Sequence, residues 1–494
     1  MSAHSSSRIR AEPYLKLKDL LLLLFLTVGA LLVHGYHAWA EDAEIYVPGI
    51  EKILHPEFYP FNAQFFEAHA HATFFPYVIA ESVRISGLHL ETAFFAWQII
   101  SIFLLLLACW YLSRTCFDDP AARWAGVGLV AALFTMPVAG TSLYVMDQYV
   151  NPRNLSAFAA IFAVAKAVDQ KYFKAALLLI FAAAIHPLMA VFALSLCILL
   201  ALVRRMPLSL AALWVPFGLS FGPPPKAYDQ VALSRPYFYV THWHWYEWLG
   251  VIGPMALLWW FGRVARRKQW KNADLLCRAL LIYQSIYLAV ALLLSIPARF
   301  EALARLQPMR SLHLLYIIML LLAGGVLGEF VLKNSVRRWL ALFVPLCAGM
   351  FMAQRVLFPA DAHIEWPGAR SKNQWVEAFL WIRGNTPVDA VFALDPYYME
   401  VAGEDEQGFR AIARRSSTAD AVKDSGAVSM FPAMADEWWR QVQAQAGWRN
   451  FDQAQFQRLQ AEYGVTWVVL QQPGPPGLDC PYHNQAVLVC RLSR

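Results

Sequence analysis

Residues 20–44 read LLLLLFLTVGALLVHGYHAWAEDAE, an apolar run followed within a few residues by acidic side chains. Four basic residues precede the run: Arg8, Arg10, Lys16 and Lys18. Because Lys and Arg stay on the cytoplasmic side of a membrane span, the N-terminus is predicted to be cytoplasmic. Glu41 and Asp42 then lie outside, at the membrane surface. No small-residue cleavage site follows the run directly, so we expect an uncleaved first span that also acts as the targeting signal.

The composition is that of a polytopic membrane protein. Of the 494 residues, 58% are apolar, 14% are aromatic and only 15% are charged, and the mean hydropathy is +0.41. No water-soluble globular domain needs so much apolar surface. The net charge of +6 does not indicate a nucleic-acid partner, because many of the basic residues gather in short segments between apolar runs.

Eleven apolar runs predict membrane-spanning helices. After residues 20–33 they are 92–112, 124–140, 155–168, 172–185, 187–203, 208–221, 248–262, 275–296, 310–332 and 338–356. With this count, five basic clusters fall on the inner side. They are Arg114 with Arg123, Lys171 with Lys174, Arg204 with Arg205, the group Arg263, Arg266, Arg267, Lys268 and Lys271, and the group Lys333, Arg337 and Arg338. That agreement predicts an α-helical polytopic membrane protein with about 11 spans.

The same count predicts two domains. We expect residues 1–357 to form a transmembrane domain with a large first outer loop at 34–91. Residues 358–494 are then a small extracytoplasmic α+β domain. Within the first loop, residues 73–85 are apolar but short, and they contain Pro76 and two charged side chains. We interpret them as an interfacial or re-entrant helix on the outer side.

The tail has ordinary polarity and a mixed pattern. Helices are predicted at 372–383, 436–445 and 453–463, and strands at 390–394, 465–470 and 486–492. Cys480 and Cys490 lie in this tail, where an oxidising compartment would allow them to form a disulfide.

Two outer loops supply candidate site carboxylates. Asp42 and Glu41 are candidate catalytic residues, because a carboxylate at the membrane surface accepts a hydroxyl proton or holds a divalent cation against a phosphate. The alternative is a solvated loop start. In the next outer loop, Asp147 and Arg153 are candidate substrate-binding residues, since arginine suits bidentate phosphate binding. The alternative there is a capped turn with an Asp–Arg pair.

Three further outer segments offer substrate-binding candidates. His186 precedes Pro187 in a predicted outer turn between two spans, where a tolerated polar residue is the alternative. Arg310 opens a span on the outer side and suits a phosphate at headgroup depth, with ordinary headgroup contact as the alternative. Trp243 belongs to the aromatic cluster 237–248, which is either a membrane-boundary belt or a surface for stacking on sugar rings.

A weak metal-site pattern lies in the first outer loop. Glu67, His69 and His71 share one face if the segment is a strand, whereas only Glu67 and His71 share one on a helix. Either arrangement would allow metal binding. A purely structural role is the alternative.

The many spans and the early acidic pair resemble the C-type membrane glycosyltransferases. Glu41-Asp42 match the acidic motif of their first outer loop, and Asp147 matches a looser acidic position in the second. Residues 381–392, WIRGNTPVDAVF, resemble the start of extracytoplasmic domains in such proteins. The Trp-Trp-Asp signature of oligosaccharyltransferases is missing, because residues 438–440 read Trp-Trp-Arg. Residues 420–423, DAVK, are similar to a second motif of that family, and we interpret this similarity as coincidental.

The resemblance implies an enzyme without a Rossmann domain that moves a sugar, hexosyl or pentosyl, from a polyprenyl-phosphate carrier to an acceptor. The reaction would take place on the outer face of the plasma or inner membrane, with Asp42 as the base. The implied partners are a lipid-linked sugar donor and membrane lipids. The cofactor is unknown, with a divalent cation as an open possibility.

A non-catalytic polytopic scaffold or a transporter is the alternative. Transporters usually carry ionisable residues near mid-membrane and often have repeated halves. The spans here carry little charge and no halves repeat. Asp42, Asp147 and Arg310 meeting in one outward cavity would favour the enzyme, and scattered positions would favour the scaffold.

Overall fold

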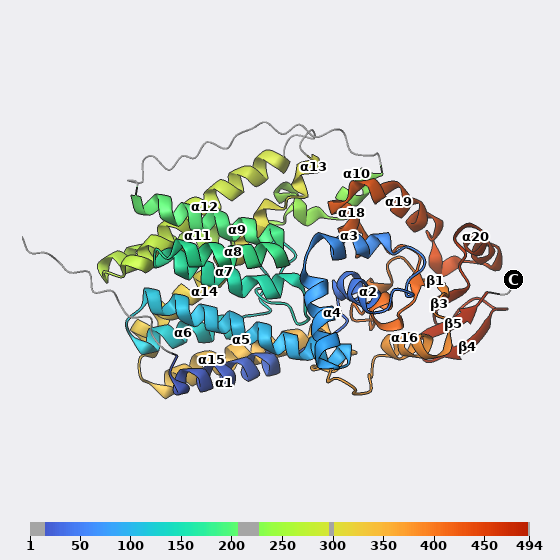
Figure 1. The fold of residues 1–494 in the computed structure, drawn as a ribbon, viewed down its shortest axis with the longest axis horizontal. Coiled ribbons are helices and arrows are strands. Elements are labelled where there is room, and N and C mark those ends of the chain that lie inside the picture. Colours follow the sequence, from blue (N-terminus) through green and yellow to red (C-terminus); the bar gives the residue numbers. More distant parts are fainter. Residues whose placement is uncertain (1–14, 206–226, 296–300, 493–494) are drawn as a thin grey trace, which may run out of the picture.

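The apolar runs form a helical bundle at one end of an elongated molecule (Figure 1). The computed structural model describes residues 15–205, 227–295 and 301–492. The long helices of the bundle are α1 (Leu17–His34), α5 (Leu90–Cys116), α6 (Pro120–Ala132), α7 (Pro152–Val168), α8 (Tyr172–Ile185), α9 (Pro187–Arg205), α11 (Trp245–Arg267), α12 (Lys271–Ser295), α14 (Leu312–Leu327) and α15 (Val336–Leu357).

Seven helices of the described part are long and apolar enough to cross a membrane: Leu17–His34, Leu90–Cys116, Pro187–Arg204, Trp245–Arg267, Lys271–Ser295, Pro308–Leu332 and Val336–Leu357. The helices α6, α7 and α8 have 13, 17 and 14 residues, fewer than a straight span needs. The predicted span at 208–221 lies outside the described residues. A mostly helical membrane protein is confirmed, and the count of eleven spans stays a prediction.

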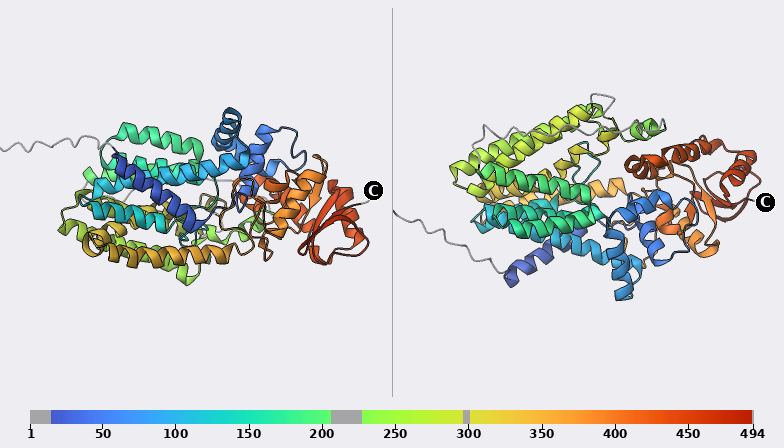
Figure 2. Two further views of the ribbon diagram at one scale, coloured as in Figure 1. Left: turned by 90° about the horizontal axis from the view of Figure 1, so that it is seen from below. Right: turned by 45° about the horizontal axis from the view of Figure 1, so that its top comes forward.

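The predicted inner clusters lie near one another at one end of the bundle. Three contacts join their neighbourhoods: Arg204 Nη2 to Val168 O (2.7 Å), Asn272 Nδ2 to Thr115 O (2.8 Å) and Lys268 Nζ to Glu329 Oε1 (3.1 Å). The first outer loop and the tail lie at the other end (Figures 1 and 2). The bundle therefore has a basic end and an end that carries the polar segments.

Close packing of backbones places α14 inside the bundle. A methyl group at Gly324 would collide with the backbone of Ala125 on α6, and one at Gly126 would lie 2.6 Å from the carbonyl oxygen of Leu321. Small residues allow such close approach between membrane helices. By contrast, α15 exposes Leu340, Val344 and other large apolar side chains, as a lipid-facing helix does.

The first outer loop folds into three short helices, α2 (Ala43–Leu54), α3 (Gln64–Ala72) and α4 (Phe75–Ser86). The apolar stretch at 73–85, predicted as an interfacial or re-entrant helix, forms α4. Its Phe75 and Ile79 are buried, whereas Phe74 and Ile85 beside them are exposed. An exposed apolar pair at the edge of the bundle fits the interfacial interpretation.

The tail contains a mixed five-stranded sheet in the order β2-β1-β3-β5-β4. Its strands are β1 (Val391–Ala393), β2 (Ser416–Ser417), β3 (Trp467–Gln471), β4 (Asp479–His483) and β5 (Val487–Arg491). Strands β2, β1 and β3 pair in parallel, and β3, β5 and β4 pair antiparallel. Three strands are confirmed. The two-residue β2 and the half-exposed β4 escaped prediction because neither carries a run of apolar residues.

The three helices predicted for the tail are also present, as α16 (Gln374–Asn385), α19 (Ala435–Ala444) and α20 (Gln453–Tyr463). Cys480 and Cys490 form a disulfide bond. One hydrophobic core joins tail and loop, since Val47 and Ile50 of α2 pack in the same cluster as Phe379 of α16 and Phe409. Figure 2 shows the loop helices between the bundle and the sheet. The division of the chain at residue 357 stays a prediction.

A buried arginine connects the first outer loop to the tail. Arg410, in α17 (Phe409–Ala413), is 1% exposed. Its guanidinium donates to Glu44 Oε1 at 2.6 Å, Asp420 Oδ2 at 2.9 Å and Asp424 Oδ1 at 2.6 Å. Glu44 belongs to α2, and Asp424 opens α18 (Asp424–Met430). Burial raises the pKa of Glu44 to about 7, although Arg410 opposes that rise.

Replacing Arg410 with Met should destabilise the protein by about 3–5 kcal/mol, because buried carboxylates would lose their cation. Arg440→Met is the matched control. Arg440 pairs with Glu437 at the surface and is 70% exposed, so its loss should cost less than about 1 kcal/mol. Thermal unfolding of each purified variant in detergent measures the two losses of stability. Equal midpoints for the two variants would contradict the structural role of Arg410.

Candidate functional site

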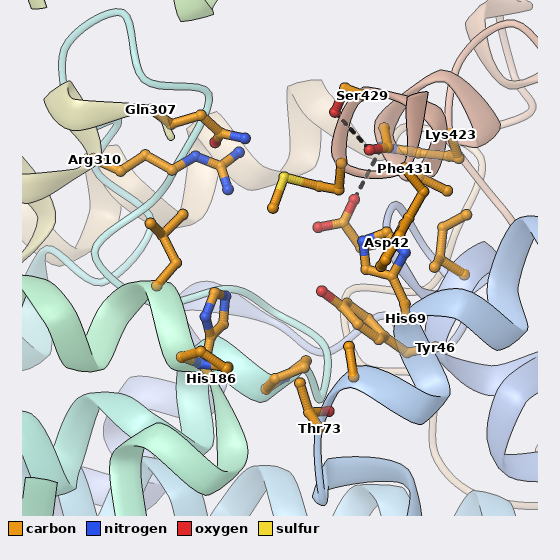
Figure 3. A pocket seen from close by; sticks show the side chains of 18 of the residues that line it. Asp42, Tyr46, His69, Thr73, His186, Gln307, Arg310, Lys423, Ser429 and Phe431 are labelled. Atoms are coloured by element: carbon orange, nitrogen blue, oxygen red, sulfur yellow. Dashed lines mark hydrogen bonds and ion pairs between the residues drawn. The ribbon is translucent and has the colours of Figure 1, made fainter. Parts of the chain in front are cut away.

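A cavity of about 220 Å³ lies where the first outer loop, the tail and the outer ends of the bundle helices meet (Figure 3). Its lining comes from residues 42–46, 69–73, 152, 186–188, 235–237, 307–310 and 423–431. Asp42, Arg310 and His186, all predicted site residues, are among them. Segments far apart in the sequence thus meet in one chamber between the tail and the end of the bundle opposite the basic clusters.

Asp42 faces this cavity from the start of α2. The preceding residue, Glu41, has a left-handed backbone conformation with φ of 59°. The Asp42 side chain is 38% exposed, and its Oδ1 lies 3.9 Å from Lys423 Nζ. Figure 3 shows Asp42 beside His69 and Tyr46, with Arg310 on the opposite side. The carboxylate is therefore available to a ligand in the cavity.

Glu41 has a different environment. It forms an ion pair with Lys423 and does not line the cavity. Burial acts to raise the pKa of Glu41, but the charge of Lys423 and hydrogen bonds from Glu406 and Lys423 lower it to about 2. Burial also disfavours the charged form of Lys423, yet Glu41 and Asp42 outweigh it and raise the pKa of the ammonium group. Of the two predicted catalytic carboxylates, only Asp42 is presented to a ligand.

Asp147 and Arg153 pair with each other behind the cavity wall. Arg153 Nη2 donates to Asp147 Oδ2 at 2.6 Å, Arg153 Nε donates to the same oxygen at 3.0 Å, and Asn151 Nδ2 donates to it at 2.7 Å. Both charged side chains are buried, and neither lines the cavity. The Asp–Arg pair of the alternative interpretation is present, and a direct substrate contact of these two residues stays a prediction. Their neighbour Pro152 does line the cavity.

Three cationic side chains line the cavity: Arg235, Arg310 and Lys423. The guanidinium carbons of Arg310 and Arg235 lie 5.7 and 5.9 Å from the ring centre of Tyr237. Arg235 Nη2 also donates to Ser425 Oγ at 2.7 Å. In both arginines the Nε atom is buried without a hydrogen-bond partner in the described structure. With Asp42 as its only lining carboxylate, the described cavity carries excess positive charge and suits an anion.

The three predicted metal residues do not all share one face, and metal binding by them stays a prediction. They lie on α3, where residues four apart share a face, so Glu67 and His71 lie on one side and His69 on another. Only His69 lines the cavity. In the described residues, His, Cys, Asp and Glu ligand atoms within 4.8 Å of one another occur at His37, Asp361 and Glu365, outside this cavity. Within the described residues, Asp42, His69 and His186 form no such group.

Trp243 is not in the cavity. Its side chain is 7% exposed and packs beside Gly140, and its Nε1 donates to the carbonyl of Tyr237 at 3.3 Å. The aromatic side chain that the cluster 237–248 contributes is Tyr237. Of this cluster, Tyr237 and not Trp243 lines the cavity, and stacking of Trp243 on a sugar ring stays a prediction.

Sequence reasoning missed Lys423, Arg235 and Tyr46 as lining residues. Lys423 ends the segment DAVK, residues 420–423, whose similarity to a family motif we interpret as coincidental. Lys423 lies next to Asp42, and Asp420 binds Arg410. Arg235 and Tyr46 carry no comparable local pattern.

No protein-family model and no curated protein sequence matches this chain. Solved structures do resemble it. A crystal structure of the Archaeoglobus fulgidus oligosaccharyltransferase in complex with Zn and sulfate is 14% identical, with 92% of this chain and 67% of that chain covered and a TM-score of 0.48. Its apo form is 13% identical, with 93% and 70% covered and a TM-score of 0.47.

A third similar structure is archaeal oligosaccharyltransferase AglB from Archaeoglobus fulgidus in complex with an inhibitory peptide and a dolichol-phosphate. It is 13% identical, with 92% of this chain and 69% of that chain covered and a TM-score of 0.44. The structures that this chain resembles are C-type membrane glycosyltransferases. At this level of similarity, function has to be argued from the cavity itself.

His69 gives the site a pH dependence that stability measurements detect. Burial lowers its pKa from 6.5 to about 4, although Asp42 partly opposes this. A lowered pKa contributes stability that is complete above about pH 6.5 and is lost as the pH falls toward 4. His69→Gln removes this loss. The difference in thermal midpoint, variant minus wild type, should therefore be more positive at pH 5 than at pH 7.5.

The matched control is His71→Gln, two residues away on the exposed side of α3. Its difference from wild type should be the same at both pH values. If the difference in thermal midpoint between His69→Gln and wild type does not change with pH, that result would contradict the burial of a neutral imidazole in the cavity.

Proposed function

We propose that the chain is a membrane glycosyltransferase that moves a sugar from a polyprenyl-phosphate carrier to an acceptor on the outer side of the membrane. One observation carries the proposal. Asp42 shares a single cavity with Arg235, Arg310 and Lys423 at the ends of the membrane helices. A base and several cations in one chamber are what sugar transfer from a phosphate carrier requires.

Asp42 is the proposed general base. In the reaction, an acceptor oxygen forms a bond to the anomeric carbon of the sugar as the bond from that carbon to the carrier phosphate breaks. The acceptor proton passes to the Asp42 carboxylate, and the bonding electron pair leaves with the phosphate. Asp42 is accessible, and in the described structure the ion contact of its carboxylate is the 3.9 Å approach to Lys423 Nζ. Glu41, paired with Lys423, would hold that ammonium group in position.

The cations stabilise the leaving group. Negative charge grows on the carrier phosphate in the transition state, and pre-positioned donors lower its energy. Arg310 and Arg235 each have a buried Nε without a partner among the described residues, so each has donor capacity for a phosphate oxygen. Asp147 keeps Arg153 neutralised behind them. A lipid tail would extend from the cavity past Leu188 and Met430, which also line it.

The chemistry is proposed without a metal ion in the cavity. Asp42, His69 and His186 line it but do not form a group with coordinating spacing in the described structure. Lys423 already lies beside the carboxylate that a cation would need. The positive charge at the phosphate is then supplied by arginine and lysine side chains.

Two features support a cytoplasmic N-terminus and an extracytoplasmic tail in the plasma or inner membrane. The basic clusters gather at the end of the bundle away from the cavity, as the positive-inside rule expects. The tail contains the Cys480–Cys490 disulfide, and disulfides persist in oxidising compartments. The cavity would then open on the outer face.

Asp42→Asn should reduce the rate of sugar transfer in proteoliposomes by about 100- to 10 000-fold, the usual contribution of a general base. The protein should still insert and fold, because the Asp42 side chain is 38% exposed and its Oδ1 lies 3.9 Å from its ion partner, Lys423 Nζ. The control is Glu462→Gln, an exposed carboxylate on α20, which should transfer sugar at the wild-type rate. Wild-type turnover in Asp42→Asn would remove the central assignment.

Arg310→Met should weaken binding of a short-chain polyprenyl phosphate by about tenfold or more, because a charged hydrogen bond to phosphate contributes about 1.5–3 kcal/mol. Arg310→Lys keeps the charge but loses the planar donor pair, so its affinity should be intermediate. Arg370→Met, at a side chain that is 90% exposed, should bind like wild type. Unchanged affinity in Arg310→Met would favour a scaffold or transporter over the enzyme.

A further inference from the structure

Three segments that are distant in the sequence meet outside the cavity, between the first outer loop and the start of the tail. Residues 36–41 follow α1, residues 361–365 follow α15, and residues 404–408 belong to a tail loop. Backbone hydrogen bonds join them: Tyr36 N to His363 O (3.0 Å), Glu365 N to Tyr36 O (2.9 Å), Gly408 N to Trp39 O (2.8 Å) and Glu41 N to Glu406 O (2.8 Å). This junction fixes the backbone that leads into Asp42.

Side chains with metal-ligating atoms converge there. His37, Asp361 and Glu365 each offer one ligand atom, and these atoms all lie within 4.8 Å of one another. His37 Nδ1 is 3.2 Å from Glu365 Oε1. A cation that binds nitrogen and oxygen ligands at about 2.0–2.6 Å has ligand atoms no more than about 5 Å apart. His37 and Asp361 are 0% and 4% exposed, and the Glu365 side chain is 20% exposed, so the group is largely shielded from solvent.

The junction carries negative charge without matching cations. Glu404 and Asp405 add two more buried carboxylates next to Asp361 and Glu365. In the described ranges, no Lys or Arg forms an ion pair with any of these four carboxylates. The one ion pair that they form there joins Glu365 to His37. Buried carboxylates in proteins are normally paired with cations or coordinate metals.

A buried amide side chain points into the same group with one atom unsatisfied. Gln407 is 0% exposed, and its Nε2 donates to Asp361 Oδ2 at 2.6 Å and to Glu365 Oε1 at 3.0 Å. Its Oε1 has no hydrogen-bond partner within the described structure. With the amide turned over, Oε1 would face the two carboxylates, an arrangement that a cation between them stabilises.

We propose that His37, Asp361, Glu365 and the Gln407 amide oxygen bind a divalent cation that joins the first outer loop to the tail. The mixed set of carboxylates, an amide oxygen and an imidazole suits a first-row ion such as Mn²⁺. The ion would lie outside the catalytic cavity and act by position. It fixes residues 404–408, whose Glu406 carbonyl holds the backbone of Glu41 next to Asp42.

The test is a Mn²⁺ titration of the full-length protein after chelator treatment, with free Mn²⁺ measured by electron paramagnetic resonance. Wild type should bind one ion that the double variant Asp361→Asn, Glu365→Gln binds at least tenfold more weakly. Glu462→Gln and Asp42→Asn should bind it like wild type. Equal binding by the double variant would overturn the proposal. If Asp42→Asn lost the ion while the double variant kept it, the proposal would also be overturned, because the ion would then lie in the cavity.

A second measurement needs no variant and so does not depend on a variant folding. Chelator treatment should lower the thermal midpoint of wild type, and added Mn²⁺ should restore it, because a ligand of the folded state stabilises that state. An unchanged midpoint after removal and return of the metal, with no Mn²⁺ bound in the titration, would also overturn the proposal. Sugar transfer by Asp42 can persist or fail independently of either result.

Discussion

The buried guanidinium of Arg410 is the interaction on which the site depends. It binds Glu44, two residues after Asp42, and Asp424, the residue after Lys423. A charge buried this deeply is tolerated only with partners in good geometry, and the three carboxylates around Arg410 supply them. The carboxylate and the ammonium group that meet in the cavity are therefore held by one network, built from the first outer loop and the tail.

The location of this network explains the character of the cavity. The bundle supplies Arg310 and His186 from the ends of helices, whereas the loop and the tail supply Asp42 and Lys423. Groups enclosed between apolar helix ends and protein interact more strongly than they would in open water. A phosphate that enters would exchange its water for fixed donors, while its lipid tail stays with the apolar helices. The cation site proposed at residues 37, 361, 365 and 407 would stiffen the same junction from its other side.

Much of this arrangement follows from local patterns in the chain. Apolar runs predicted the bundle helices because burial in lipid requires them, and the basic clusters predict an outward side for Asp42, Arg310 and His186. The sequence does not show which of the two adjacent carboxylates, Glu41 or Asp42, faces the cavity. A left-handed backbone at Glu41, which costs about 1–2 kcal/mol, separates its side chain from that of Asp42. Lys423 is 382 residues away in sequence from its partner Glu41. Tertiary packing brings the two together, and no local sequence pattern encodes that packing.

The most direct measurement of the central claim is a structure determined with a short-chain polyprenyl phosphate bound. The account predicts phosphate density in the cavity, within hydrogen-bond distance of Arg310 and facing Asp42, with the lipid chain leaving between the outer helix ends. Phosphate density at a site remote from this cavity, with none beside Arg310 and Asp42, would contradict it.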